Sequence, residues 1–446
     1  MKNTHEVVSN RWKPWLLCAI LFLLLSACSN ETESGNEVQN DQQILNEQDN
    51  ADSLKEKSAP REPVTLVFYS TANWTEEAFN ERFGDAMRSG FPEYTIEYVR
   101  VGEGTTLPEM IASDADMDVY WQASDVAIND MKEYKLTRDM TGLATKHQVD
   151  LSLLEPSVLE DIRTQSDGML YALPIVINTA GFFYNKEIFD RFGVDYPYDG
   201  ITWEEVIALG ERLNRVDGDK PYYGIGYHFN QVIDLNAFSI PYVDPVTEKP
   251  TILAEERWTI LYDTLVNAAR LTGDNQLHNH QKFIVEQEVG MLAALANLFL
   301  NIDMSGLDWD MVTYPTFQGQ DPNIGPQAYP TYFGITSKSK HPEEAMEVLK
   351  HLLSVEVQLD LSKRGIIPVI QDETVMDAFG TGTAYGDKNL QAIIGRNFAS
   401  MAARPSYGST ARSAYTGSAR LLELIEGTKD RNTIFREIYE DAMQKI

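Results

Sequence analysis

The sequence has few cysteines, no long hydrophobic run and no excess of basic residues, and each absence excludes a class of protein. Only Cys18 and Cys28 occur among 446 residues, which excludes a scaffold built on several disulfides. The apolar run at residues 15–27 has 13 residues, whereas a membrane-spanning helix needs about 20. The net charge is −30 at pH 7, and no basic stripe is interleaved with aromatic residues. We therefore expect no nucleic-acid partner.

The N-terminal segment has the composition of an export signal. Basic residues precede the short apolar run, and the run ends in the small residues of "LSAC" (25–28). This ending resembles the lipobox of bacterial lipoproteins. The resemblance implies a signal peptide over residues 1–27 and attachment of a diacylglycerol to the thiol of Cys28. An ordinary signal peptide with an incidental cysteine is the alternative.

The segment that follows predicts a tether. Residues 28–63 are dominated by Asn, Gln, Glu, Asp and Ser, and they contain few apolar residues. Such a composition buries too little apolar surface to offset the entropy lost on ordering, so we expect this acidic segment to be disordered. Lipid on Cys28 would then hold the folded part at the outer face of the cell membrane. We expect a bacterial source, of the Gram-positive type.

The folded part opens with a pattern that is typical of a parallel sheet. "VTLVFYS" (64–70) and "YTIEYVRV" (94–101) have the β-branched and aromatic content of buried strands, and residues 75–87 between them repeat apolar residues at helical spacing. A strand, a helix and a strand over so short a stretch predict a βαβ unit. A third strand is predicted over 117–121, with Trp121 just past its end, where ligands collect in such sheets.

Ordered motifs in the middle and late parts of the chain resemble those of the family 1 extracellular solute-binding proteins of ABC importers, of which maltose-binding protein is the best known. The resemblance extends over about residues 64–446. The motifs are "YALPIVINTAGFFYNKEIF" (171–189), "TWEEVIALGERLNR" (202–215), "FIVEQEVGML" (283–292), "WDMVTYPTFQG" (309–319) and "GITSKSKHPEEAMEVLKHLLSVEVQ" (334–358).

The resemblance implies an α/β protein with the two-lobe periplasmic-binding-protein-like fold, which has a hinge and an interlobe cleft. The chain would cross between the lobes near residues 177–179 and 324–333. Each lobe would then be discontinuous in sequence. The expected lobes are 64–177 plus 329–380 and 178–328 plus 381–446.

The same resemblance implies a function in transport. The protein, expected to be a monomer, would capture a solute outside the cell and deliver it to the permease of an ABC importer. The expected solute is a sugar or oligosaccharide. Closure of the lobes around the ligand is the expected mechanism. Two alternatives remain open at this point. One is a ligand-sensing surface lipoprotein that partners a receptor, and the other is a lipid-anchored enzyme that degrades glycans.

Ligand contacts are expected at positions where the chain aligns with the family. Trp121 falls on a sugar-stacking position and Asn178 on a polar crossover position. Asn297 stands where the maltose-binding member has a stacking tryptophan, which disfavours maltose. Arg404 suits a carboxylate or phosphate on the ligand. The expected ligand-binding residues are Asn73, Trp74, Tyr120, Trp121, Asn178, Tyr227, His228, Asn230, Asn297, Tyr329, Arg404 and Tyr407; for each aromatic residue, core packing is the alternative.

Motifs of enzymes and metal sites are weak in this sequence, so we expect no enzymatic activity, cofactor or bound metal. The adjacent acidic pairs all open predicted helices, where the backbone favours negative charge. Thr202 and Glu205 in "TWEE" predict a capping box. The aspartates at 114, 116 and 118 imitate a calcium loop, but they lack the glycine at its sixth position. "HNH" (278–280) has no visible third ligand and is predicted to be a surface loop.

Overall fold

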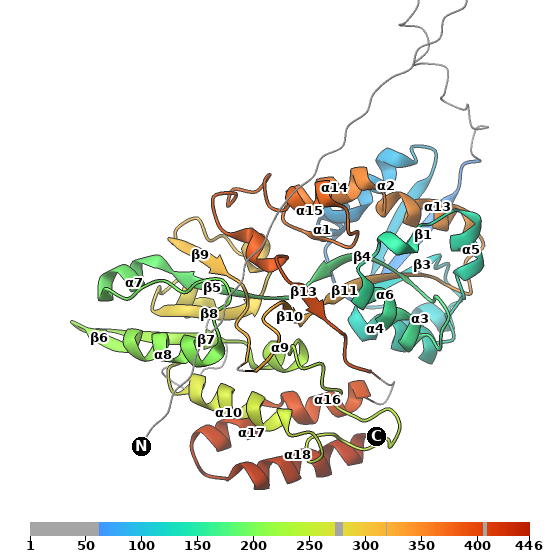
Figure 1. Cartoon of the computed structure of the whole chain (residues 1–446). Helices are drawn as coiled ribbons and strands as arrows, with labels where there is room; N and C mark the ends of the chain where they lie inside the picture. The colour runs from blue at the N-terminus through green and yellow to red at the C-terminus, as the bar shows by residue number, and fades with distance from the viewer. Residues whose placement is uncertain (1–61, 273–279, 318, 405–407) are drawn as a thin grey trace, which may run out of the picture. The chain divides into compact units, whose positions relative to one another are not determined.

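The computed structural model describes residues 62–272, 280–317, 319–404 and 408–446, which belong to one compact unit, Arg61–Ile446 (Figure 1). The predicted signal peptide, Cys28, nearly all of the tether, His278 and Tyr407 lie outside the described residues. The predictions made for them therefore stay predictions.

The first lobe is built on a six-stranded sheet in the order β12-β4-β11-β3-β1-β2. β1 pairs in parallel with β2 and β3, which confirms the predicted βαβ unit. β11 is antiparallel to both of its neighbours, β3 and β4. The strands are β1 (Thr65–Ser70), β2 (Thr95–Arg100), β3 (Val119–Ala123), β4 (Leu173–Asn178), β11 (Tyr329–Ile335) and β12 (Ile367–Pro368).

The second lobe is built on a five-stranded sheet in the order β6-β7-β8-β5-β9. A separate parallel pair joins β10 to β13. The strands of the five-stranded sheet are β5 (Ala180–Asn185), β6 (Arg215–Asp217), β7 (Lys220–Tyr227), β8 (Val289–Leu295) and β9 (Trp309–Val312), and the pair is β10 (Ile324–Gln327) and β13 (Asn397–Ala399).

Two passages of the chain between the sheets lie side by side. β4 of the first sheet ends at Asn178 and β5 of the second begins at Ala180, so Thr179 lies between the sheets. The returning chain ends β10 at Gln327 and starts β11 two residues later. The buried hydroxyl of Thr179 donates a hydrogen bond of 3.0 Å to the carbonyl oxygen of Gln327. The two passages are therefore tied to each other at the place where a hinge would act.

Helices cover both sheets, and they group by lobe in Figure 1. The first sheet carries α1 (Glu76–Phe79), a π-helical segment (Asn80–Gly84), α2 (Asp85–Gly90), α3 (Leu107–Ala112), α4 (Ser124–Glu133), α5 (Thr141–Lys146), α6 (Pro156–Gln165), α13 (Pro342–Leu352), α14 (Val355–Lys363) and α15 (Glu373–Asp377). The second lobe carries α7 (Lys186–Phe192), α8 (Trp203–Leu213), α9 (Phe229–Asp234), α10 (Arg257–Ala269), α11 (His280–Ile284), α12 (Leu298–Asn301), α16 (Gly408–Thr416), α17 (Ser418–Ile425) and α18 (Arg431–Lys445). Short 3-10 segments occur at Leu151–Leu153 and Leu390–Ile393.

Local signals placed several helix ends correctly. Thr202 and Glu205 form the predicted capping box at the start of α8, and the side chain of Trp203 is buried. Pro342 is the first residue of α13, where a missing backbone N–H is tolerated. α13 ends at Leu352. α14 begins at Val355, and the hydroxyl of Ser354 caps it by accepting a hydrogen bond from the backbone N–H of Val357.

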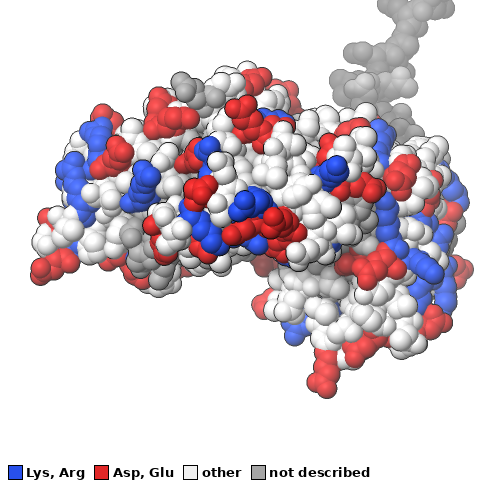
Figure 2. Space-filling view, turned by 90° about the horizontal axis from the view of Figure 1, so that it is seen from below, with Lys and Arg blue, Asp and Glu red and all other residues white. Residues whose placement is uncertain are grey.

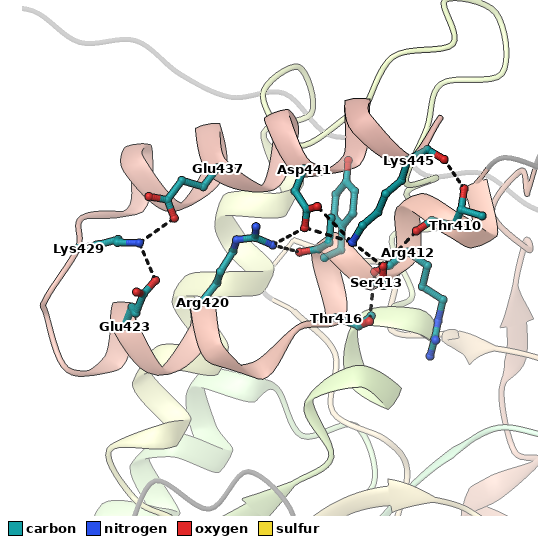
Figure 3. A network of polar contacts seen from close by, with 12 residues as sticks. Thr410, Arg412, Ser413, Thr416, Arg420, Glu423, Lys429, Glu437, Asp441 and Lys445 are labelled. Atoms are coloured by element: carbon teal, nitrogen blue, oxygen red, sulfur yellow. Dashed lines mark hydrogen bonds and ion pairs between the residues drawn. The ribbon is translucent and has the colours of Figure 1, made fainter.

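A network of ion pairs and hydrogen bonds links the three C-terminal helices (Figure 3), and α16 joins it through hydrogen bonds of Thr410 and Ser413 with Lys445. Asp441 of α18 accepts from Arg420 of α17 at 3.0 Å and lies 3.2 Å from Lys445. Lys429, in the turn between α17 and α18, lies 3.0 Å from Glu423 and 2.9 Å from Glu437. Partly exposed pairs contribute little singly, so this network orients the helices more than it stabilises the fold.

Candidate ligand-binding cleft

Two adjacent cavities lie beside the two passages of the chain at Thr179 and Ala328, since the neighbouring Asn178 and Tyr329 belong to their lining. Cavity A, of about 280 Å³, is lined from both lobes, and cavity B, of about 350 Å³, is lined mainly from the second. Leu295 and Tyr329 line both cavities, so the two adjoin. Cavity A is lined by Ala72, Trp74, Arg82, Gln122, Ala123, Val176, Ile177, Asn178, Leu295, Ala296, Asn297, Leu300, Tyr329, Thr331, Gly365, Ile366, Ile367, Phe379 and Ile393.

Side-chain amides give cavity A its hydrogen-bonding capacity. Gln122, at the end of β3, donates from Nε2 to the hydroxyl of Thr71 at 2.9 Å. Asn178, the last residue of β4, accepts from the backbone N–H of Thr179 at 2.9 Å. In the described part of the chain, nothing engages the Nδ2 group of Asn178 or the side-chain amide of Asn297. Both amides are therefore available to a ligand, as donors and, for Asn297, also as an acceptor.

Trp74 is one of three aromatic residues among the described residues that line cavity A, with Tyr329 and Phe379, and its ring already has protein contacts. The ring is stacked on Phe83 with centroids 6.0 Å apart, and it meets Trp121 edge-on at 5.1 Å. The guanidinium carbon of Arg82 lies 4.8 Å from the Trp74 ring centroid. The indole is thus fixed in position at the wall of the cavity, half-buried.

Cavity B contains an ion pair. The carboxylate of Asp234, at the end of α9, accepts two hydrogen bonds from Arg412, one of them at 2.8 Å from Nε. It also accepts from the hydroxyl of Tyr242, whose pKa is raised well above its usual value by burial and by this carboxylate. Arg404 lines the same cavity and donates to the hydroxyl of Ser124. The single acid that lines cavity B is therefore already neutralised.

The structure brings six of the predicted ligand residues to the cavities. Trp74, Asn178 and Asn297 line cavity A, Asn230 and Arg404 line cavity B, and Tyr329 lines both. Arg82, Gln122 and Thr331 also line cavity A, and sequence reasoning missed them. Gln122 directly follows Trp121 in the chain, and successive side chains of a strand point to opposite faces of the sheet. A buried Trp121 would therefore have predicted that Gln122 faces the other side.

The prediction for Trp121 was wrong. β3 continues to Ala123, so Trp121 lies inside the strand and pairs with Phe333 of β11 instead of following the strand end. Its side chain is 1 % exposed, and its ring is stacked on Phe333 at 5.5 Å and on Phe79 at 6.0 Å. The alternation of the strand directs the indole into the core, away from any ligand.

Tyr120 and Tyr227 are also core residues, against the prediction. Both side chains are 0 % exposed. The hydroxyl of Tyr120 bonds to Thr71 and Asp130, and that of Tyr227 donates to the carbonyl oxygen of Leu265 at 2.9 Å. Each hydroxyl is satisfied within its own lobe, so neither is available to a ligand.

Two further predicted residues lie away from both cavities. Asn73 is exposed in the loop after β1, with a backbone φ of 55°. His228 packs on His280, the first residue of α11, with ring centroids 5.3 Å apart and Nε2 3.3 Å from Nδ1 of His280. The loop was predicted to include all of "HNH" (278–280), but His280 is the first residue of helix α11.

Within residues 62–272, 280–317, 319–404 and 408–446, no group of three or more His, Cys, Asp or Glu side chains is arranged to hold a metal ion. Of the helices in these ranges, none combines the length and the hydrophobicity that a membrane span requires.

Comparisons with known proteins agree with this architecture. Residues 71–359 match the model of a family described as bacterial extracellular solute-binding protein. A sugar transporter from Rhizobium etli, solved in an open conformation, superposes with a TM-score of 0.67 at 16 % identity, over 85 % of this chain and 99 % of the other. An ABC substrate-binding protein from Listeria monocytogenes, in complex with cycloalternan, gives a TM-score of 0.67 at 14 % identity, over 86 % and 99 %.

Sequence comparison with curated proteins aligns a smaller part of the chain than these structural comparisons do. A candidate binding protein of Brucella abortus is 23 % identical over 253 residues, which are 51 % of this chain and 56 % of that protein. The match therefore spans little more than half of the curated relative's length. The family model, by contrast, covers well over half of this chain and includes β3, β4, β8 and β11, which contribute residues to the lining of cavity A. The chain belongs to the family of bacterial extracellular solute-binding proteins.

Proposed function

We propose that the protein captures a carbohydrate outside the cell and delivers it to the permease of an ABC importer. The observation that carries this proposal is cavity A, which both lobes line with side-chain amides and aromatic rings. Sugar hydroxyls donate and accept hydrogen bonds, as do the amides of Gln122, Asn178 and Asn297. The apolar faces of a sugar suit the rings of Trp74 and Tyr329. The relatives described above as a sugar transporter and as a cycloalternan complex support the same class of ligand.

Closure of the two lobes is the proposed mechanism. A ligand in cavity A contacts Gln122 of the first sheet and Asn297 of the second lobe together, so it stabilises the arrangement in which these residues are close. The passages at Thr179 and Ala328 are the proposed hinge, because they join the two sheets and lie side by side.

Binding without turnover is the proposed activity. Hydrolysis of a glycoside requires two carboxyl groups beside the scissile bond. Among the described residues, none that lines cavity A is acidic, and the one acid that lines cavity B, Asp234, is paired with Arg412.

Attachment to the outer face of the membrane through acylated Cys28 is also part of the proposal. The lipobox-like "LSAC" and the polar composition of residues 28–63 support it. The lipid and tether would keep the monomeric binding protein near its permease while leaving the lobes free to close.

Titration calorimetry with a panel of neutral and acidic saccharides tests the proposed ligand class. At least one saccharide should bind and be recovered unchanged. Asn178→Ala and Asn297→Ala should each weaken that binding by roughly 2- to 13-fold, because each removes a hydrogen bond of about 0.5–1.5 kcal/mol. Ser113→Ala, at an exposed helix end remote from the cavities, is the control. Failure of every saccharide to bind, or conversion of the bound saccharide, would overturn the proposal.

A further inference from the structure

We infer that cavity A takes an anionic group of the saccharide, a carboxylate or a sulfate, on the guanidinium of Arg82. This inference rests on the proposed function and narrows it, because it makes the ligand an acidic saccharide. It depends on three observations: the charges that line the cavity, the contacts of Arg82 and the contacts of its neighbour Arg364.

The lining of cavity A has a charge opposite to that of the chain. Arg82 is its one charged residue, and none of the lining residues is acidic. The whole chain has 67 acidic and 37 basic residues, and acidic and basic side chains are interspersed over the face shown in Figure 2. A cavity for neutral sugars in so acidic a protein would be expected to use carboxylates as acceptors for hydroxyl groups. The positive charge of Arg82 therefore favours an anion in this cavity.

In the described part of the chain, no carboxylate forms an ion pair with Arg82, although the charge of the adjacent Glu81 acts on it. The recorded contact of Arg82 is with the ring of Trp74, and a ring face only partly offsets the loss of water around a guanidinium. Burial lowers the pKa of Arg82, the charge of Arg364 lowers it further, and the charge of Glu81 raises it by less. A guanidinium stays protonated at neutral pH, so Arg82 brings a positive charge to a cavity whose described lining has no carboxylate. A partly buried charge without an ion-pair partner is costly, and a ligand anion would reduce that cost.

Arg364 does not fill this role, because it already has an ion-pair partner and a backbone acceptor in the protein. Its guanidinium lies 3.1 Å from the carboxylate of Asp360 and donates to the carbonyl oxygen of Glu81 at 2.7 Å. Arg364 is also absent from the lining of cavity A. Of these two neighbouring arginines, only Arg82 is presented to the cavity.

The position of Arg82 in the chain supports a functional role. It lies in the π-helical segment Asn80–Gly84, between α1 and α2. Such segments are frequent at functional sites. The planar guanidinium can also donate two parallel hydrogen bonds to two oxygens of a carboxylate or sulfate. A hydroxyl group has a single oxygen and cannot accept such a pair.

The test is calorimetric titration of the purified protein with three oligosaccharides of equal length: a neutral one, its uronate counterpart and its sulfated counterpart. Wild-type protein should bind an acidic member roughly tenfold or more tightly than the neutral one. Arg82→Gln should abolish that preference and change the affinity for the neutral member by less than about threefold. Arg82→Lys should keep part of the preference, since it retains the charge but not the planar fork. Arg163→Gln, at an exposed position on α6, is the matched control.

The outcomes separate this inference from the proposed function. Preference for the uronate identifies a carboxylate, and preference for the sulfated member identifies a sulfate. The inference is overturned if wild-type protein binds the neutral member as tightly as both acidic ones. It is also overturned if Arg82→Gln loses the same factor of affinity for all three saccharides. Either result leaves the proposed function standing. Binding of no saccharide overturns both. Should Arg82→Gln fail to fold, the wild-type preference and the Arg82→Lys variant still decide the question.

Discussion

Arg404, in the segment after β13, donates a hydrogen bond to the hydroxyl oxygen of Ser124, the first residue of α4. α4 follows β3 of the first sheet. The segment of Arg404 belongs to the second lobe, since the backbone N–H of Ala402 donates to Gln327, whose side chain donates in turn to the carbonyl oxygen of Asn236. This bond therefore joins the two lobes beside cavity B.

Removal of the Ser124 hydroxyl should weaken ligand binding without altering the lining of either cavity. If the bond to Arg404 stabilises the closed arrangement, Ser124→Ala should lower affinity by roughly 3- to 10-fold, which corresponds to one hydrogen bond of about 1 kcal/mol. The loss should come from faster dissociation, measured by stopped-flow tryptophan fluorescence. Ser113→Ala should leave the rate unchanged. An unaltered dissociation rate in Ser124→Ala would show that the bond does not contribute to closure.

Trp121 should matter for stability. Trp121→Ala removes a ring that is packed between Phe79 and Phe333, and it should lower the free energy of unfolding of the unliganded protein by about 3–5 kcal/mol. Urea denaturation followed by circular dichroism measures this change. A variant that keeps wild-type stability but loses affinity would restore Trp121 as a ligand-stacking residue.

Trp74 should matter for binding, because it lines cavity A. Trp74→Ala should reduce affinity for the ligand by roughly 1–3 kcal/mol, or about 5- to 150-fold, measured by titration calorimetry. Its effect on the stability of the unliganded protein should be smaller than that of Trp121→Ala, because Trp74 is only half-buried. Equal affinity in Trp74→Ala and wild type would assign the indole to packing alone.

Ligand binding should stabilise and compact the protein. At a ligand concentration a hundredfold above the dissociation constant, mass action contributes about 2.7 kcal/mol to the folded state. For cooperative units of about 150–250 residues, this corresponds to a rise in melting temperature on the order of 5–10 °C. Solution scattering with the same ligand should show a smaller radius of gyration. A raised melting temperature with an unchanged scattering profile would refute closure while leaving binding intact.

Acylation should depend on Cys28. In a bacterial host, Cys28→Ala should abolish incorporation of labelled palmitate and release the protein from the membrane fraction, because no other cysteine follows the predicted cleavage site. Cys18→Ala is the matched control, since it lies within the predicted signal peptide. Persistent labelling of Cys28→Ala would contradict the lipoprotein prediction.

The sequence by itself determined the family, the fold class and most of the local structure near its motifs. Order and spacing of motifs such as "YNK" and "TWEE" survive at low identity, and the family model confirms the resemblance that they carry. The capping box at Thr202 and the start of α13 at Pro342 were predictable because each depends on contacts within one helical turn.

Tertiary structure alone decided which residues share a cavity. Trp121 was assigned to the ligand because the sequence does not show that β3 runs on to Ala123, and one extra strand residue determines which way a side chain faces. Arg82 was missed because its role depends on neighbours far away in sequence: Asn178, Asn297 and Thr331 line the same cavity. Such groupings are set by how the strands pair and the lobes pack, and no local pattern encodes them.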